Sequence, residues 1–196
     1  VFMDADLLDW DTHFVPGLLG PLLTRPDVAL VKGYYERPGV GGDGVETAYD
    51  GGRVTELVAR PWIALAHPEL AGLVQPLAGE WAIRRSLFES LSVPSGYAVE
   101  LAALIDTCRL LGPDAIAQVD LGRRAHRHQA LRDLGSMATQ ILSASGRRST
   151  GSAPEHVALD QPHKVGPGIE TTRSEISLLE RPPAIGVPPP VAGFEA

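Results

Sequence analysis

Apolar residues in the first 148 positions follow helical and strand periods in turn. Short β-branched and aromatic runs predict a strand ending near residue 5 and further strands over 28–36 and 115–122. Helical spacing predicts helices over 12–24, 53–66, 96–112 and 131–146, and residues 80–91 are expected to pass from a strand into a helix. This alternation predicts an α/β layered fold, with a mixed sheet flanked by helices.

Local signals refine three of these segments. Thr12 is the candidate cap of the first helix, and Pro61 is expected to kink or end the helix over 53–66, because proline lacks the amide hydrogen that a helix interior needs. Residues 37–52 are rich in glycine and are predicted to form a loop.

Residues 149–196 differ in composition from the part before them. They are rich in proline, glycine and serine and keep no sustained period. Such a segment buries too little apolar surface to offset chain entropy, so the prediction is a disordered tail, with a short helix around 173–180 as the one exception.

Composition narrows the class of protein. The chain has 196 residues, 44% of them hydrophobic, and the single cysteine, Cys108, excludes an internal disulfide. We expect a cytoplasmic protein that contacts no membrane. The net charge of −7 argues against a nucleic-acid binder. One basic stretch, from Arg123 to His128, fits either a small anionic ligand or a solvated turn.

Asp4 and Asp6 are the first candidates for chemistry. They directly follow an apolar strand, and an extended backbone would place their Cα atoms roughly 6.6 Å apart on one side. Ligands of open α/β sheets bind at the carboxyl ends of strands, and paired carboxylates suit Mg²⁺ or Mn²⁺. A D-x-D pair alone is weak evidence, because aspartates are common in loops.

Seven segments together are more specific than the aspartate pair. They are DAD at 4–6, FVPGLLGPLLT at 14–24, VKGYYERP at 31–38, GGRVTELVARP at 51–61, QPLAGEWAIRR at 75–85, GYAVELAALIDT at 96–107 and AIAQVDLG at 115–122. In this order they resemble the bacterial glucosyl-3-phosphoglycerate synthase family, retaining glycosyltransferases of the GT-A fold (glycosyltransferase family 81). The resemblance ends near residue 145.

The resemblance implies transfer of glucose from UDP- or GDP-glucose to 3-phosphoglycerate, with Mg²⁺ or Mn²⁺ as cofactor. It makes Asp6 and His126 metal ligands, and Asp4 a contact of the ribose and of metal-bound water. It places Glu80 near the donor sugar. We also expect Lys32, as an inward-facing strand lysine, near the donor phosphates, and Arg124 at either the diphosphate or the acceptor carboxylate. A lysine on a strand edge or a histidine in a polar turn is also commonly just solvated.

For the acceptor, the resemblance implies that Gly52, Arg53 and Thr55 bind the phosphate, and glycines before a helix N-terminus favour anions on physical grounds as well. It places Tyr97 and Glu100 at the reaction centre. They lie three residues apart and so face one side of the predicted helix. Glu100 in the first helical turn is also a favourable charge for the helix dipole.

The sequence departs from the family in two ways. The expected Arg-Glu-His-Arg-Asn turn has Ala125 and His128 in place of glutamate and asparagine, which puts the acceptor in question. The nucleotide-binding part that family members carry ahead of the D-x-D is absent, so we expect donor binding by this chain alone to be weak. The alternatives are a related mannosyl-3-phosphoglycerate or glucosylglycerate synthase, an inactive fragment, and a noncatalytic binding remnant.

The resemblance also implies a homodimer, as expected for the full-length family.

Overall fold

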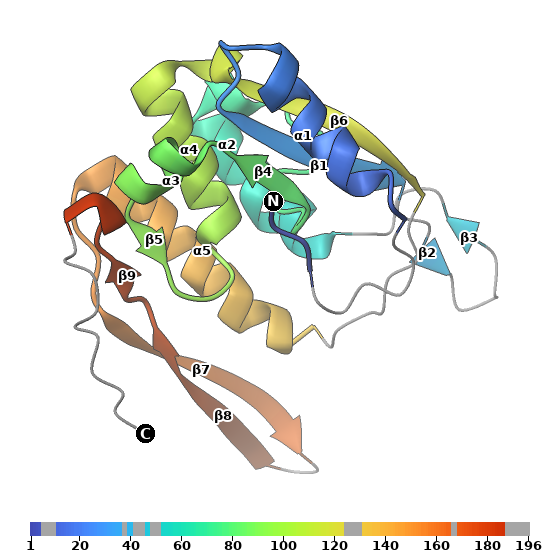
Figure 1. The fold of residues 1–196 in the computed structure, drawn as a ribbon. Helices are drawn as coiled ribbons and strands as arrows, with labels where there is room; N and C mark the ends of the chain where they lie inside the picture. Colours follow the sequence, from blue (N-terminus) through green and yellow to red (C-terminus); the bar gives the residue numbers. More distant parts are fainter. Residues whose placement is uncertain are drawn as a thin grey trace, which may run out of the picture.

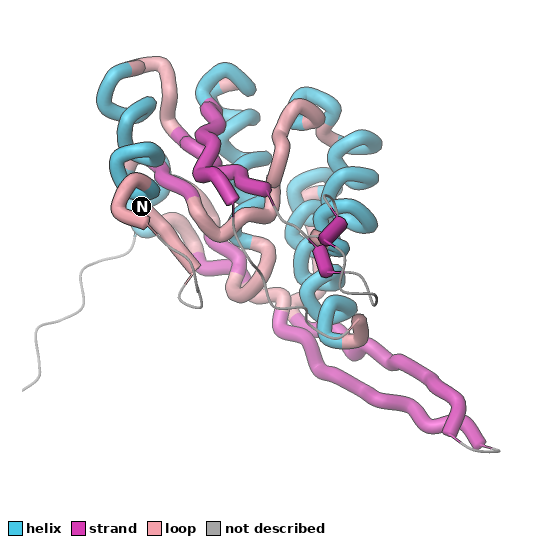
Figure 2. The backbone as a smooth tube through the Cα atoms, turned by 90° about the vertical axis from the view of Figure 1, so that its right-hand side faces the viewer, coloured by secondary structure: helices cyan, strands magenta, loops and turns pink. Residues whose placement is uncertain are grey.

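The protein is described by a computed structural model, which covers residues 1–4, 11–36, 39–40, 46–47, 52–123, 131–165 and 168–186. A mixed sheet lies between helices, and a long two-stranded hairpin extends away from this layered body (Figures 1 and 2). The predicted α/β fold is therefore confirmed.

The central sheet has strand β1 (Leu30–Glu36) in its middle. Strand β6 (Ile116–Arg123) runs parallel to it and strand β4 (Trp81–Ile83) antiparallel. Phe2 forms an antiparallel bridge to Trp81, with N···O distances of 2.7 and 3.2 Å. The chain through Phe2 thus runs parallel to β1 and β6, and all three segments end at one edge of the sheet, as predicted for the first strand.

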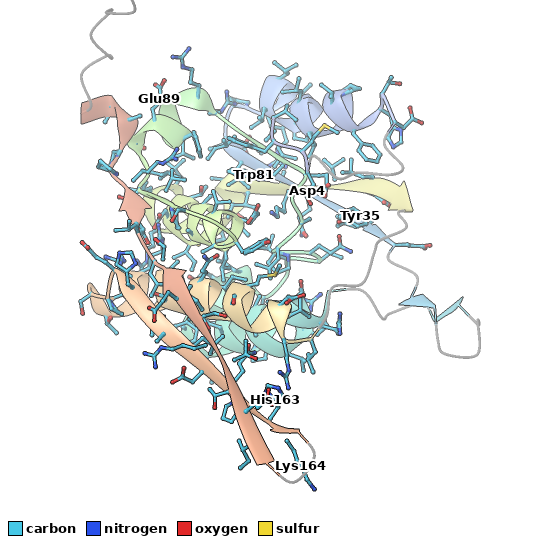
Figure 3. All side chains as sticks on the ribbon, turned by 90° about the horizontal axis from the view of Figure 1, so that it is seen from below. Asp4, Tyr35, Trp81, Glu89, His163 and Lys164 are labelled. Atoms are coloured by element: carbon cyan, nitrogen blue, oxygen red, sulfur yellow. The ribbon has the colours of Figure 1, made fainter. Side chains whose placement is uncertain are left out.

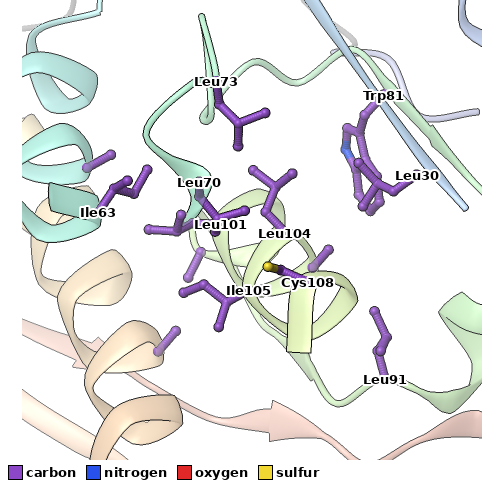
Figure 4. Close-up of a cluster of buried hydrophobic side chains, with 14 of the residues drawn as sticks. Leu30, Ile63, Leu70, Leu73, Trp81, Leu91, Leu101, Leu104, Ile105 and Cys108 are labelled. Carbon is purple, nitrogen blue, oxygen red and sulfur yellow. The ribbon is translucent and has the colours of Figure 1, made fainter. Parts of the chain in front are cut away.

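Side chains along the strands alternate between two apolar layers. On one face, Val31, Ala82 and Ala117 pack with Leu18 and Leu22 of the helix over Phe14–Thr24. The other face packs against three helices. The apolar layer between them draws on both the sheet and the helices and includes Leu30, Trp81, Ile63, Leu101, Leu104 and Ile105 (Figure 4). This period of two explains why short apolar runs in the sequence form strands buried on both sides.

Five α-helices are described: α1 (Phe14–Thr24), α2 (Arg60–Ala66), α3 (Arg85–Ser90), α4 (Val99–Leu111) and α5 (Asp133–Thr150). Helix α1 covers one face of the sheet, and α2, α4 and α5 lie on the other (Figure 1). The prediction of a Thr12 cap is wrong. His13 precedes α1 without a side-chain cap, and the Thr12 hydroxyl donates instead to Asp11 at 3.1 Å.

The helix predicted over 53–66 contains a wide turn ahead of its proline. Residues 53 and 54 are helical, Thr55–Ala59 form a π-helical turn (η1), and α2 follows with Pro61 near its start. The Arg60 amide donates to the carbonyl of Thr55, five residues back. A wider turn relieves the clash that the proline ring makes with the carbonyl four residues earlier.

The remaining elements are short connectors and a hairpin. The hairpin pairs β7 (His156–Val165) with β8 (Gly168–Ser177). The connectors are β2 (Gly39–Val40), β3 (Glu46–Thr47), η2 (Pro68–Leu70), β5 (Val93–Pro94), η3 (Pro113–Ala115), β9 (Glu180–Arg181) and η4 (Ala184–Gly186).

The predicted disordered tail is wrong for residues 149–165 and 168–186, and the helix predicted over 173–180 is a strand in its first part. Exposure alternates only over residues 173–177, at the base of β8, where Ile176 is buried between exposed Glu175 and half-buried Ser177. An ionic cluster then fixes the end of the segment. Arg148 of α5 donates to Asp106 of α4 at 2.7 Å and to Glu180 of β9 at 2.9 Å.

Candidate functional site

Carboxylates from three separate segments meet at the carboxyl edge of the sheet. Asp4 follows the N-terminal segment, Glu80 directly precedes β4, and Glu100 lies in the first turn of α4. Asp4 lies against Gly79, the neighbour of Glu80, and the charges of Asp4 and Glu80 both raise the pKa of Glu100. This is the edge at which parallel and mixed α/β sheets bind their ligands.

Asp4 is exposed (Figure 3). It lies against the backbone of Gly79. A Cβ atom on Gly79 would be 2.0 Å from the Asp4 Oδ1 atom, so only glycine leaves room for this carboxylate. Oxygen ligands of this kind suit Mg²⁺ or Mn²⁺. Within the part of the chain that the structure describes, no group of three His, Cys, Asp or Glu side chains is arranged to hold a metal ion.

Lys32 points from β1 toward the face of the sheet that α4 covers. Its side chain is 1% exposed, its Nζ atom donates to the Ala78 carbonyl, and it lies 5.8 Å from the Trp81 ring centroid. A buried ammonium group needs such partners, because burial disfavours its charge. Lys32 therefore holds the 78–81 segment to β1 and supplies a positive charge beside Glu100.

Glu100 is half-buried, and its environment favours the protonated carboxyl group. Burial raises the pKa of Glu100, the positive charge of Lys32 opposes that shift, and Asp4 and Glu80 add to it. A perturbed carboxyl group among like charges is typical of a functional site. Tyr97 lies just before the helix and is 52% exposed, so its ring is accessible beside Glu100.

Gly52 adopts the left-handed region with φ of +86° and directly precedes the helical residues that start at Arg53. The Glu56 amide donates to the Gly52 carbonyl at 2.9 Å, which begins the helical hydrogen bonding. Amides of the first turn before Glu56 face the helix N-terminus, where anions are favoured. Arg53 is half-buried there and Thr55 is buried, so the predicted phosphate-binding residues do form one turn.

Four of the predicted site residues lie outside the described residues: Asp6, Arg124, His126 and His128. The described part of β6 ends at Arg123, one residue before the basic stretch, at the same sheet edge as Asp4.

Two glutamines that were not among the predicted site residues hold the loop before Glu80. The Gln75 side chain accepts from the Tyr35 amide at 3.3 Å and donates to the Tyr35 carbonyl at 2.5 Å, as a neighbouring strand would. Gln118 of β6 accepts from Val74 at 2.7 Å and donates to Gly72 at 3.1 Å. Their partners lie about forty positions away, so no local pattern marks them.

None of the described helices combines the length and the apolar composition required to cross a membrane.

Comparison with known proteins identifies the relatives of this chain. No protein-family model matches it. The curated glucosyl-3-phosphoglycerate synthase of Mycolicibacterium smegmatis is 48% identical over 182 residues, covering 93% of this chain and 59% of the relative. The one of Petrotoga mobilis is 39% identical over an alignment of 197 residues, covering 96% and 59%.

Solved structures give the same result. Glucosyl-3-phosphoglycerate synthase of Mycobacterium tuberculosis in complex with Mn²⁺, UDP-glucose and phosphoglyceric acid matches with a TM-score of 0.77 at 43% identity, covering 94% of this chain and 59% of that one. The same enzyme with Mn²⁺, UDP and glucosyl-3-phosphoglycerate matches with a TM-score of 0.78 at 42% identity, covering 93% and 59%. The resemblance that the motifs predicted is confirmed: in sequence and in fold, this chain is a relative of the glucosyl-3-phosphoglycerate synthases and spans about 59% of their length.

Proposed function

We propose that this chain forms the metal-binding and acceptor-binding part of a retaining glycosyltransferase that moves glucose from UDP- or GDP-glucose to 3-phosphoglycerate, giving glucosyl-3-phosphoglycerate. The observation that carries the proposal is that Asp4 lies against Gly79, next to Glu80, at the carboxyl edge of the sheet, with Glu100 near enough for both charges to raise its pKa. The named relatives support it, since solved structures of one of them hold Mn²⁺, UDP-glucose and phosphoglyceric acid.

In this proposal, Asp4, Asp6 and His126 hold Mg²⁺ or Mn²⁺. When bound, a divalent cation neutralises the diphosphate leaving group. Asp4 also contacts the donor ribose, and Gly79 keeps the space that its carboxylate needs. Glu80 and Arg124 lie on the donor side, and Lys32 serves the donor indirectly, because its buried ammonium group fixes the segment that carries Gly79 and Glu80.

The acceptor phosphate binds at the turn formed by Gly52, Arg53 and Thr55. The first-turn amides and the Arg53 guanidinium offer charge-assisted hydrogen bonds to a phosphate, and the left-handed Gly52 opens the turn to it. His128 stands where the family has an asparagine for the acceptor carboxylate, and a protonated imidazole can pair with that group.

Tyr97 and Glu100 line the reaction centre. A glutamate here can hold a sugar or acceptor hydroxyl, and its negative form stabilises positive charge that develops on the sugar. We do not assign Glu100 as a covalent nucleophile, because retaining transferases of this fold are thought to react on one sugar face, with the leaving phosphate assisting deprotonation of the acceptor.

The test is a transfer assay on the purified chain with Mn²⁺, in which UDP-glucose and GDP-glucose are each paired with 3-phosphoglycerate and with glycerate. The proposal expects a glucosylated product only with 3-phosphoglycerate, at a low rate if donor binding is weak. Product with glycerate instead would favour a glucosylglycerate synthase. An absence of both transfer and 3-phosphoglycerate binding would favour the noncatalytic remnant.

We further propose a cytoplasmic homodimer without nucleic-acid or membrane partners. The far end of the β7–β8 hairpin supports self-association, since two-stranded hairpins are marginal in water on their own. Figure 3 shows His163 and Lys164 on this far part, and Ile169 there is 78% exposed. Light scattering coupled to size exclusion tests this, and a monomeric mass at micromolar concentration contradicts it.

A further inference from the structure

Helix α4 begins without a cap of its own. Ala98 precedes it and has no side chain that could accept a hydrogen bond, and Gly96 just before has φ of +83°. Tyr97 lies between these two residues, and Glu100 follows in the first helical turn. The direction of both functional side chains therefore depends on whatever fixes residues 96 and 97 from outside the helix.

Gln140 of α5 holds the residue just before this uncapped helix start. Its Oε1 atom accepts from the Tyr97 amide at 2.9 Å, and its Nε2 atom donates to the Ser177 carbonyl at 3.4 Å. A Cβ on Gly96 would lie 2.5 Å from the same Oε1 atom, so the Gln140 amide sits directly on the glycine. One side chain thus ties the Tyr97 turn to α5 and to the end of β8.

The C-terminal segment holds the residues just before this turn. The Leu179 carbonyl accepts from both the amide and the hydroxyl of Ser95, each at 3.0 Å. Val93 pairs with Arg181 in the β5–β9 ladder, and Arg148 donates to the Ser92 carbonyl at 3.1 Å. With residues 92–95 anchored in this way, the Gln140 contact is what sets the backbone at Tyr97.

We propose that Gln140 is a positioning residue for the reaction centre: its hydrogen bond to the Tyr97 amide fixes the turn that directs Tyr97 and Glu100 toward the acceptor. The functional half of this inference rests on the function proposed above. Its structural half, that Gln140 holds the Tyr97 turn, stands on the hydrogen bonds alone.

Three variants separate the roles. Gln140→Leu keeps the size of the side chain and removes both hydrogen bonds. Gln140→Glu keeps an acceptor for the Tyr97 amide and loses the donor to Ser177. Thr139→Ala is the matched control, because Thr139 lies next to Gln140 on α5 and its hydroxyl bonds only within the helix, to the Gly135 carbonyl at 2.9 Å.

The first readout is hydrogen exchange of the Tyr97 amide on the full chain. Gln140→Leu should speed exchange about 2- to 10-fold, as expected for the loss of one such hydrogen bond, whereas Gln140→Glu and Thr139→Ala should leave it near the wild-type rate. Unchanged exchange in Gln140→Leu, or equal acceleration in Thr139→Ala, would overturn the inference.

The second readout is 3-phosphoglycerate binding by calorimetry, with the KM and kcat of transfer where turnover is measurable. Gln140→Leu should raise the acceptor Kd several-fold, or lower kcat at unchanged donor KM, while Thr139→Ala should change neither. Equal effects of the two variants would reduce Gln140 to a structural role. If the wild-type chain binds no 3-phosphoglycerate, the proposed function fails, and the exchange rates still decide whether Gln140 holds the turn.

Discussion

Arg148→Met should destabilise the protein strongly, because Arg148 is the centre of the ionic cluster that joins α4, α5 and β9. Its side chain is 6% exposed, and its partners Asp106 and Glu180 are 18% and 12% exposed. It donates to both carboxylates and to the carbonyls of Ser92 and Ala144. Methionine of similar length would remove this cation from both carboxylates, and Glu180 would keep only the longer contact to Arg147, at 3.6 Å.

Removing one partner of a buried ion pair costs about 3–5 kcal/mol, most of it from the charge left behind. In a domain of this size, that loss corresponds to a decrease in Tm of roughly 6–20 °C. The assays are urea unfolding and thermal unfolding followed by circular dichroism. A triple variant that also carries Asp106→Asn and Glu180→Gln should recover part of the loss, since neither buried carboxylate is then left charged without Arg148.

Arg173→Met provides the matched control. Arg173 on the hairpin is 62% exposed and pairs with Asp160 at 3.4 Å and Glu175 at 3.3 Å, so its removal should cost at most about 1 kcal/mol. The comparison is between the free energies of unfolding of the two variants, extrapolated to zero urea. If these differ by less than about 1 kcal/mol, which is the error of the extrapolation, the segment after residue 150 contributes little to the folded body and the reasoning is refuted.

Three further predictions concern the site. Glu100→Gln should raise Tm at pH 7, because glutamine stays uncharged at every pH. In the wild type, the stability that protonated Glu100 provides is complete below its ordinary pKa of 4.5 and is lost as pH rises through the raised pKa. Thermal scans of the two proteins should therefore converge below pH 4.5. Gly79→Ala should weaken Mn²⁺-dependent UDP-glucose binding in calorimetry at nearly unchanged Tm, because its Cβ displaces the exposed Asp4 carboxylate. The acceptor KM should rise between about pH 5.5 and pH 8 as His128 loses its proton.

Each of these has a clear contrary result. A Tm difference for Glu100→Gln that does not change with pH would mean that the carboxyl group titrates normally. Unaltered nucleotide-sugar binding in Gly79→Ala would remove Asp4 from the metal site. A flat acceptor KM across that pH range would exclude a protonated His128 as the carboxylate partner.

The elements that the sequence predicted well are those whose signals are local. The helix over 96–112 has a continuous apolar stripe and ends at Gly112, and α4 ends one residue before that glycine, which has φ of +85°. Apolar runs such as residues 28–36 became strands because both faces of the sheet are covered. Motif order predicted the relatives correctly, because seven segments constrain a match far more than one.

The errors have a common physical cause, which is that the deciding partners lie far away in the chain. Nothing near residue 180 shows that Glu180 will meet Arg148, yet that contact orders a segment whose composition is typical of disorder. Gln140 shares no motif with Tyr97, which is 43 positions away. Proline and charged residues in the hairpin are not typical of strands, and only the pairing of β7 with β8 makes these strands evident.

The most direct test of the central claim is calorimetric binding of 3-phosphoglycerate to the wild-type chain and to Arg53→Ala, with glycerate as the competing ligand. The account predicts saturable binding of 3-phosphoglycerate that falls at least about tenfold in Arg53→Ala, as expected for the loss of a charge-assisted contact to phosphate, and no binding of glycerate. Equal affinity of the two proteins, or equal affinity for the two ligands, would contradict it.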